Sequence, residues 1–316
     1  MSLPREFRRL RIGLIGFGDV ARRTFLQRVQ QRATAHGPRF ILIGRSGKPT
    51  FPLTLQRAIR SSRSLLLQAD LDQRRSAQRL AGIAQHAIVY VPTSDGHGND
   101  LTKDARARTL RTALRSRTRR LRLVYLSTTG VYGNYNGGEV NEHSACTTRQ
   151  PRSLRRLDAE RQLRPIGAHV LRVPGIYGHD RLPLARLQAG QPALRAQDDV
   201  YTNHIHADDL ARIAWIALFR GRPGRVTNAV DDTTMKMGDY FDAVADAAGL
   251  ARPPRVSRDE MGQLAREGVI HPMMLGFMNE SRRVCGDRLK NELRVQLHYP
   301  TVGDALRSRY SSSSRR

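Results

Sequence analysis

The chain has 316 residues, 54 of them lysine or arginine and 28 acidic, which gives a formal net charge of +26 at pH 7. This length allows one large domain with a smaller lobe. No run of about 18 apolar residues occurs, and residues 1–11 carry charges where an export signal is apolar. We therefore expect a soluble, cytoplasmic protein with no membrane partner. Cys146 and Cys285 are far apart and show no metal-ligand spacing, so we predict neither a disulfide framework nor a metal site.

The positive charge is almost entirely arginine and is spread from Arg5 to Arg316. Such a charge is typical of nucleic-acid-binding proteins, but no helix-turn-helix, zinc-finger or RNA-recognition motif accompanies it. We interpret it as solvated faces and predict no specific nucleic-acid site. Salt-sensitive, non-specific adhesion to polyanions is expected.

A glycine turn follows the first predicted strand, which covers residues 10–15. The sequence Gly16-Phe17-Gly18-Asp19-Val20-Ala21 fits G-x-G-x-x-(G/A), the turn that brings a backbone up to a dinucleotide diphosphate. Gly16 would make the turn, Gly18 would leave room for phosphates, and Ala21 would allow close helix packing. The following helix, over residues 20–32, would offer its N–H groups to an anion. Asp19 puts a carboxylate beside this site; its alternative role is to favour the helix start.

The second predicted strand, residues 40–44, ends at a basic turn. In NAD-selective sites an acidic residue here binds the ribose hydroxyls, whereas this chain has Arg45, Ser46 and Lys48. Two cations and a hydroxyl suit a 2′-phosphate, so we predict NADP in preference to NAD. The alternative is a basic surface turn.

Further strands are predicted at residues 65–70, 87–91, 121–126 and 169–173, and a helix at 101–115. Open α/β sheets bind ligands at the carboxyl ends of strands, so the candidate cofactor contacts there are Asp70, Leu71, Val91, Pro92, Thr93 and Ser127. After residue 180 the pattern is less regular, with helices at 208–219 and 238–248 flanking a strand at 225–230.

These patterns predict an α/β fold: a Rossmann doubly wound parallel sheet with a smaller C-terminal substrate lobe. We expect an NAD(P)-binding Rossmann domain over residues 1–180. Residues 181–310 would form mainly the substrate lobe, together with a returning strand and helix. Residues 311–316 read as a disordered tail.

Several segments carry a family resemblance. The sequences LVYLSTTGVYG (123–133), VLRVPGIYG (170–178) and NHIHADDL (203–210) resemble, in order, segments of the extended short-chain dehydrogenases/reductases, the superfamily of NAD-dependent epimerases and dehydratases. The likeness covers roughly residues 10–300. It implies a Rossmann domain with a C-terminal substrate lobe, and it implies that Pro174, Gly175 and Ile176 belong to the cofactor loop after a strand.

The resemblance also implies a catalytic set of Ser or Thr, Tyr, and a Lys four residues after the Tyr. Thr128 stands at the Ser/Thr position. When Glu160 is aligned with the family's glutamate, Arg152 falls at the Tyr position and Arg156 at the Lys position. Arg156 would still offer positive charge and ribose hydrogen bonds, but Arg152 cannot replace a phenol because guanidinium stays protonated. The resemblance is therefore to atypical members of the family.

Other side chains are candidates for the missing acid or base. Thr128 would orient a carbonyl, and Tyr132 or Tyr177 would present a phenol in a loop. The histidines of the neighbouring loops, His179, His204 and His206, titrate near neutrality, although loop hydrogen bonding is their alternative role. Asp208 and Asp209 read as a helix-start pair in which Asp208 is the capping residue.

Three functions follow from these observations. The first is an NADP-binding oxidoreductase or epimerase-like enzyme with a relocated proton donor and a small-molecule substrate that no motif identifies. The second is a catalytically inactive NAD(P)-binding sensor or regulatory binding protein. The third is a polyanion-binding protein on a Rossmann scaffold. Helices 101–115 and 154–163 correspond to the dimer interface of many members of the family, and their arginines favour a monomer over a dimer.

Overall fold

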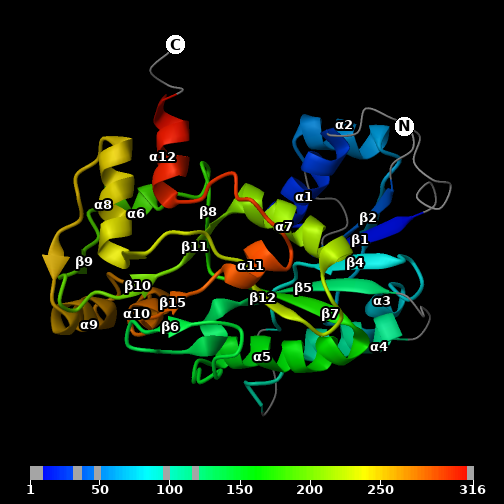
Figure 1. Ribbon diagram of the computed structural model, residues 1–316, viewed down its shortest axis with the longest axis horizontal. Coiled ribbons are helices and arrows are strands. Elements are labelled where there is room, and N and C mark those ends of the chain that lie inside the picture. Colours follow the sequence, from blue (N-terminus) through cyan, green and yellow to red (C-terminus); the bar gives the residue numbers. More distant parts are fainter. Residues whose placement is uncertain (1–9, 31–37, 46–50, 95–99, 116–120, 312–316) are drawn as a thin grey trace.

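The central sheet has seven parallel strands. The computed structural model describes residues 10–30, 38–45, 51–94, 100–115 and 121–311. The strand order is β12-β7-β5-β4-β1-β2-β3, so the chain winds outward from β1 in both directions (Figure 1). The strands are β1 (Arg11–Ile15), β2 (Arg39–Gly44), β3 (Leu65–Gln68), β4 (His86–Val89), β5 (Arg122–Thr128), β7 (Ala168–Val173) and β12 (Val226–Asn228). This topology confirms the predicted doubly wound Rossmann sheet.

Helices cover both faces of the sheet, as expected for parallel strands joined by crossovers (Figure 1). One face is covered by α1 (Asp19–Gln30), α2 (Leu53–Ser61) and α7 (Ala207–Arg220). The other is covered by α3 (Arg74–Gln78), α4 (Ala105–Arg115) and α5 (Pro151–Leu163).

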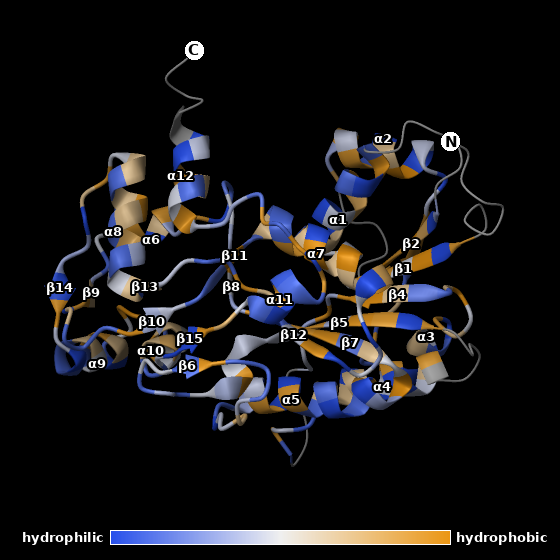
Figure 2. Cartoon of the chain, viewed as in Figure 1, coloured by the Kyte–Doolittle hydropathy of each residue, from blue (hydrophilic) through white to orange (hydrophobic). Residues whose placement is uncertain are grey.

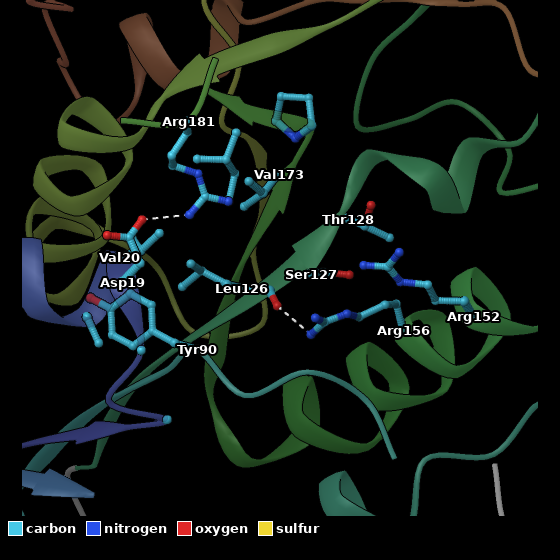
Figure 3. A pocket seen from close by; sticks show the side chains of 15 residues that line it. Asp19, Val20, Tyr90, Leu126, Ser127, Thr128, Arg152, Arg156, Val173 and Arg181 are labelled. Atoms are coloured by element: carbon cyan, nitrogen blue, oxygen red, sulfur yellow. Dashed lines mark hydrogen bonds and ion pairs between the residues drawn. The ribbon is translucent and has the colours of Figure 1, made fainter. Parts of the chain in front are cut away.

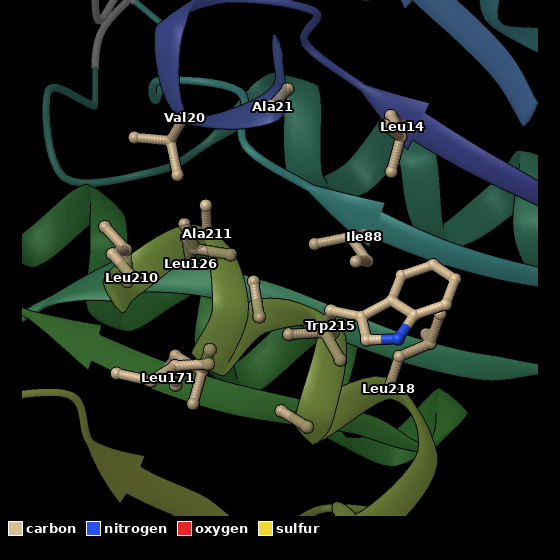
Figure 4. Close-up of a cluster of buried hydrophobic side chains, with 14 of the residues drawn as sticks. Leu14, Val20, Ala21, Ile88, Leu126, Leu171, Leu210, Ala211, Trp215 and Leu218 are labelled. Carbon is tan, nitrogen blue, oxygen red and sulfur yellow. The ribbon is translucent and has the colours of Figure 1, made fainter. Parts of the chain in front are cut away.

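The strand residues alternate between two hydrophobic cores. Leu14 packs with Trp215 in the core under α1 and α7, whereas its neighbour Ile15 packs with Leu110 in the core under α4 and α5 (Figure 4). Each fully buried side chain of this size contributes about 1.5–3 kcal/mol. In Figure 2 the inner strands β5 and β7 run largely in the hydrophobic colours, and α4 and α5 carry many hydrophilic residues.

Much of the chain from β8 (Gly175–Tyr177) onward builds a second group of elements beside the carboxyl edge of the sheet, whereas α7 and β12 belong to the sheet layers (Figure 1). Its core joins α6 (Leu184–Gln188), α8 (Met237–Ala248) and α12 (Val302–Ser311) around Phe241 and Val244. The parallel pair of β6 (Glu139–Val140) with β15 (Arg283–Val284) connects it to the segment after β5, and β8 pairs in parallel with β11 (His204–His206). The remaining elements are η2 (Thr129–Tyr132), η3 (Arg164–Ile166), β9 (Ala193–Leu194), β10 (Tyr201–Thr202), β13 (Met235–Lys236), β14 (Arg255–Val256), α9 (Arg258–Arg266), α10 (Pro272–Met278) and α11 (Asp287–Asn291).

The prediction that Asp208 caps α7 is wrong. The cap is His206, whose ring Nδ1 accepts a hydrogen bond from the Asp208 N–H at 3.2 Å. Asp209, buried one residue later, accepts from the backbone N–H groups of His298 and Tyr299 at 3.0 and 2.8 Å. Of the predicted tail, Ser311 belongs to α12 and residues 312–316 lie outside the described part. Within the described part, no helix is both long and apolar enough to span a membrane.

Candidate functional site

The glycine turn has the geometry that the sequence predicted. Gly16 has φ of +89°, and a Cβ there would lie 2.9 Å from Val91 Cγ2 and 3.0 Å from the Val91 nitrogen. Only glycine avoids both the strain and the clash. A Cβ on Gly18 would meet only the Gly16 carbonyl oxygen, 4.0 Å away. Gly16 is therefore required by the fold, whereas the space above Gly18 is open.

The first helical N–H groups of α1 face the same space. The first hydrogen bond of the helix runs from the Arg22 N–H to the Gly18 oxygen at 2.9 Å. The N–H groups of the three preceding residues have no partner within the helix, and all three residues line a cavity of about 260 Å³. We call this the smaller cavity (Figure 3). Phe17 turns away from it and packs edge-on against Phe25 and Phe51.

The carboxylate of Asp19 accepts hydrogen bonds from two arginines. Its Oδ1 accepts from Arg23 Nε at 2.9 Å and its Oδ2 from Arg181 Nη1 at 2.6 Å, as Figure 3 shows for Arg181. Arg23 also pairs with Asp180 and Asp208. Sequence reasoning missed Arg181, which lies 162 residues from Asp19. The two guanidinium groups of Arg23 and Arg181 are therefore shared among the carboxylates of Asp19, Asp180 and Asp208.

The strand ends supply the opposite wall. Of the predicted cofactor residues, the smaller cavity brings together Gly16, Gly18, Asp19, Val20, Ser127, Arg156, Pro174 and Ile176. Its lining also includes Tyr90, whose hydroxyl lies 2.7 Å from Thr24 Oγ1. Gly175 lines a larger neighbouring cavity instead. Three candidates after β4, namely Val91, Pro92 and Thr93, line neither cavity.

The candidates for the adenosine end lie apart from the smaller cavity. Arg45 is exposed directly after β2, and Ser46 and Lys48 lie outside the described residues. The Asp70 carboxylate accepts the Asp72 N–H at 3.0 Å, and Leu71 is buried in the core under α4. Leu71 thus serves packing, while Arg45 remains accessible to a ligand.

A buried ion pair supports the floor of the smaller cavity. Arg172 contacts Glu160 at 2.8 and 3.2 Å, and Ser127 Oγ donates to Glu160 at 2.6 Å. Burial by itself lowers the pKa of Arg172, but the hydrogen bonds and the charge of Glu160 outweigh it and leave this pKa raised above its usual range. The network fixes the end of β5 against α5 and β7. The hydroxyl of Ser127 is therefore committed to the scaffold.

Two arginines of α5 stand where the resemblance places Tyr and Lys. Arg156 Nη1 donates to the carbonyl oxygens of Val91 and Leu126 at 3.1 and 2.9 Å and to the Tyr125 hydroxyl at 3.0 Å. This anchors its guanidinium at the strand ends (Figure 3). Arg152, one helical turn earlier, lies beside Thr128 and lines both cavities.

Thr128 has a hydroxyl suited to contact a ligand. Its Oγ1 accepts from the Gly130 N–H at 3.1 Å, which leaves its own proton free to be donated. Because Thr128 also lines both cavities, that proton lies where a molecule in the larger cavity meets one in the smaller.

Tyr132, the second predicted catalytic residue, is placed in the core. Its side chain is 0% exposed, its hydroxyl donates to Asn228 Oδ1 at 2.8 Å, and the Arg172 guanidinium lies 4.8 Å from its ring centre. It lines neither cavity. Burial raises the pKa of the phenol further. We correct the prediction accordingly: Tyr132 closes the packing under η2 and does not reach a substrate.

The larger cavity, of about 680 Å³, adjoins the smaller one and includes the remaining candidates Tyr177 and His204. Burial lowers the pKa of His204 to about 4, so this ring is neutral at pH 7. Asp231 lies against Tyr177, and burial raises the pKa of its carboxyl to about 7. His179 and His206 line neither cavity and contact the Tyr299 ring. Among the described residues, no cluster of His, Cys, Asp and Glu could hold a metal ion.

These residues fit a dinucleotide. A Cβ at Gly18 would occupy open space at the start of α1, and the helix terminus supplies partial positive charge to it. The cavity then continues past Ser127 to Thr128 and Arg152. The smaller cavity thus extends from the glycine turn, which suits an anion, to Thr128 beside the larger cavity.

Among known proteins, similarity to this chain is found in solved structures. No protein-family model and no curated protein sequence matches the chain. A conserved protein of unknown function from Silicibacter pomeroyi DSS is 27% identical, with 96% of this chain and 98% of that chain covered and a TM-score of 0.71.

Two structures of known activity share the architecture. The dTDP-glucose 4,6-dehydratase of Bacillus anthracis str. Ames, solved in complex with NAD, is 16% identical over 97% of both chains, with a TM-score of 0.72. A nucleoside-diphosphate-sugar epimerase of Pseudomonas aeruginosa is 17% identical over 97% of both chains, with a TM-score of 0.71. At these identities the likeness shows a common fold.

Proposed function

We propose that this chain, which has the fold of the extended short-chain dehydrogenases/reductases, is an NADP-binding oxidoreductase or epimerase-like enzyme. The observation that carries the proposal is the open space above Gly18 at the start of α1. A glycine is needed at position 16 for the turn itself, but no residue that the structure describes fills the space at Gly18. That space suits a diphosphate.

The residues around the turn would hold the cofactor in a defined direction. The diphosphate would lie on the N–H groups of residues 19–21, close to Arg181. Arg156, anchored at the strand ends, would face the nicotinamide ribose. Arg45 would meet a 2′-phosphate, and this supports NADP over NAD. The bound nicotinamide would supply the carbon that gives or accepts hydride.

Thr128 and the larger cavity would position the substrate. The free proton of the Thr128 hydroxyl would be donated to a carbonyl or alcohol oxygen and so orient the reacting carbon. The candidate proton donor is the Tyr177 phenol, which lines the larger cavity and lies against Asp231. Asp231, with a pKa near 7, would hold or release a proton behind it.

A second function is favoured by two observations. Arg152 occupies the position at which the resemblance expects a phenol, and Tyr132 is buried in the core. Both facts support the alternative of an NAD(P)-binding sensor without turnover. Such a protein would bind the cofactor at the glycine turn but would catalyse no reaction.

Calorimetric titration followed by a turnover assay separates these functions. The proposal expects NADPH to bind at micromolar to low millimolar level in about 0.15 M salt, where non-specific phosphate contacts are weakened. NADPH oxidation with aldehyde, ketone or oxo-acid substrates would establish the enzyme. Tyr177→Phe should then lower turnover while leaving NADPH affinity unchanged. Binding without turnover would favour the sensor, and absence of binding would exclude both functions.

A further inference from the structure

The helices on one face of the sheet carry a large excess of positive charge. We call α3, α4 and α5 together the arginine face; these three helices contain ten arginines and two acids. On the opposite face α1, α2 and α7 contain seven arginines and three acids, and the helices α6 and α8–α12 contain seven basic and seven acidic residues. The charge is therefore uneven across the fold, although arginine occurs along the whole sequence.

The two acids of the arginine face are buried. Asp158 is 9% exposed and Glu160 is 1% exposed. Glu160 pairs with Arg172 at 2.8 Å on its inner side, and Asp158 Oδ2 accepts from the Asp104 N–H at 2.9 Å and from Gln162 Nε2 at 2.6 Å. Neither carboxylate therefore balances an exposed arginine of these helices.

Several arginines of this face are exposed and have no carboxylate partner among the residues that the structure describes. They come from all three helices, and α4 contacts both α3 and α5, so they lie on one continuous surface (Figure 1). An extended anion across this surface would meet several guanidinium groups at once. The arginines are Arg74 and Arg75 on α3, Arg108 and Arg111 on α4, and Arg161 on α5.

The other side chains of the arginine face narrow the choice of partner. The three helices contain no Phe, Tyr or Trp, the side chains on which unpaired bases stack. Among the described residues, none of the exposed large apolar side chains belongs to these helices, whereas helices on a membrane surface insert such side chains. A second copy of the chain would bring arginines against arginines, and like charges repel. A duplex nucleic acid remains the best match.

The dimensions of the face suit the backbone of a duplex. At about 1.5 Å per residue, the 11 residues of α4 and the 13 residues of α5 span about 16 and 20 Å. Duplex DNA carries one negative charge per about 1.7 Å of its axis, so several phosphates fall within that length. The planar guanidinium binds a phosphate through two parallel hydrogen bonds.

We propose that the arginine face binds duplex DNA through its phosphate backbone, with Arg108, Arg111 and Arg161 among the contacts. Phosphate contacts carry no sequence information, so the binding is independent of base sequence. The non-specific adhesion expected from the composition is thereby assigned to one face of the fold. These three arginines line neither cavity, so the DNA site is separate from the proposed cofactor site.

Fluorescence anisotropy of the full chain with a labelled duplex of about 20 base pairs tests this assignment. In about 0.1 M salt the Kd should lie at about 1–100 µM, the range of non-specific phosphate contacts. The triple variant Arg108→Gln/Arg111→Gln/Arg161→Gln should weaken binding at least about tenfold. It should also reduce the slope of log K against log salt concentration by about three.

A second triple variant provides the matched control. Arg57→Gln/Arg60→Gln/Arg63→Gln removes three exposed arginines in and directly after α2, on the opposite face, with the same change in net charge. It should weaken DNA binding less than about threefold. Lysine at positions 108, 111 and 161 keeps the charge and should keep most of the affinity, so a loss confined to the glutamine variant identifies a charge contact.

Three results would overturn the inference. One is equal weakening in the two glutamine variants, since overall charge would then explain the binding. Another is no binding of the duplex in about 0.1 M salt. The third is tighter binding of single-stranded oligothymidylate of the same length, or of vesicles that contain phosphatidylserine, than of the duplex. NADPH affinity should be unchanged in the variants of the arginine face, so this test and that of the cofactor site fail independently.

Discussion

Arg181 Nη1 lies 2.6 Å from Asp19 Oδ2, so this ion pair spans the smaller cavity between the start of α1 and the loop after β8 (Figure 3). A diphosphate on the glycine turn would compete with Asp19 for this guanidinium. Asp19→Asn should therefore tighten NADPH binding about threefold to tenfold, and Arg181→Gln should weaken it about tenfold, as measured by calorimetry.

Asp180→Asn provides the matched control for that prediction. It removes a carboxylate that also pairs with Arg23 but lines neither cavity. Its NADPH affinity should stay within about twofold of wild type. Weaker binding in Asp19→Asn would show that the carboxylate helps to hold the cofactor and that the competition is absent.

The two glycines of the turn should respond differently to alanine. Gly16→Ala forces a Cβ to within 2.9 Å of Val91 at a positive φ, so it should lower the free energy of unfolding by about 2 kcal/mol or more. Gly18→Ala meets no such contact and should change the free energy of unfolding by less than about 1 kcal/mol.

Gly18→Ala should nevertheless weaken NADPH binding at least about tenfold, because the new methyl group takes the space of the diphosphate. Urea denaturation and NADPH titration of both variants give the two readouts. Unchanged NADPH affinity in Gly18→Ala would remove the glycine turn from the cofactor site.

Sequence patterns predicted the sheet well because its inner strands lie buried between helices and read as apolar runs, and the exposed edge strand β3 is apolar as well. The strands around Leu14, Val124 and Leu171 fall close to their predicted ranges. The glycine turn was predictable because Gly16 meets a local backbone requirement. For the strands and for the glycine turn, residues close together in the sequence determine the local structure.

Long-range contacts and side-chain direction were not predictable in this way. Nothing near Asp19 in the sequence signals its partner Arg181. Tyr132 precedes a glycine, as an exposed loop phenol would, but the turn η2 directs its ring into the core under Arg172. The residue that caps α7 is His206, two positions before Asp208, and histidine lies outside the usual capping set.

Coenzyme choice depends on Arg45 in the proposal. Arg45→Asp should shift the ratio of NADPH to NADH affinity by about tenfold or more towards NADH, because it replaces a cation near the 2′-phosphate with a ribose acceptor. Arg39→Asp, at the exposed opposite end of β2, makes the same charge change away from the carboxyl edge. An equal shift in both variants would show that the effect comes from the change in overall charge and not from a contact between Arg45 and the 2′-phosphate.

Stability should fall in mild acid because buried histidines are neutral. Burial lowers the pKa of His169 to about 4, below its unfolded value of about 6.5. The unfolded chain therefore binds the extra proton first, and the stability present above about pH 6.5 is lost as the pH falls towards 4. At about pH 5 this histidine alone should cost about 2 kcal/mol.

Urea denaturation at about pH 7.5 and pH 5 measures this effect. His169→Gln should lessen the decrease in the free energy of unfolding between the two values, whereas His143→Gln, at an exposed position, should not. An equal decrease in wild type and His169→Gln would show that this ring titrates normally in the folded protein.

The most direct measurement is a crystal structure of the protein grown with NADPH. The account predicts the diphosphate on the N–H groups at the start of α1, Arg181 turned from Asp19 to a phosphate oxygen, and the nicotinamide beside Thr128. A cofactor bound elsewhere, or an ion pair of Asp19 and Arg181 that stays intact at saturating NADPH, would contradict it.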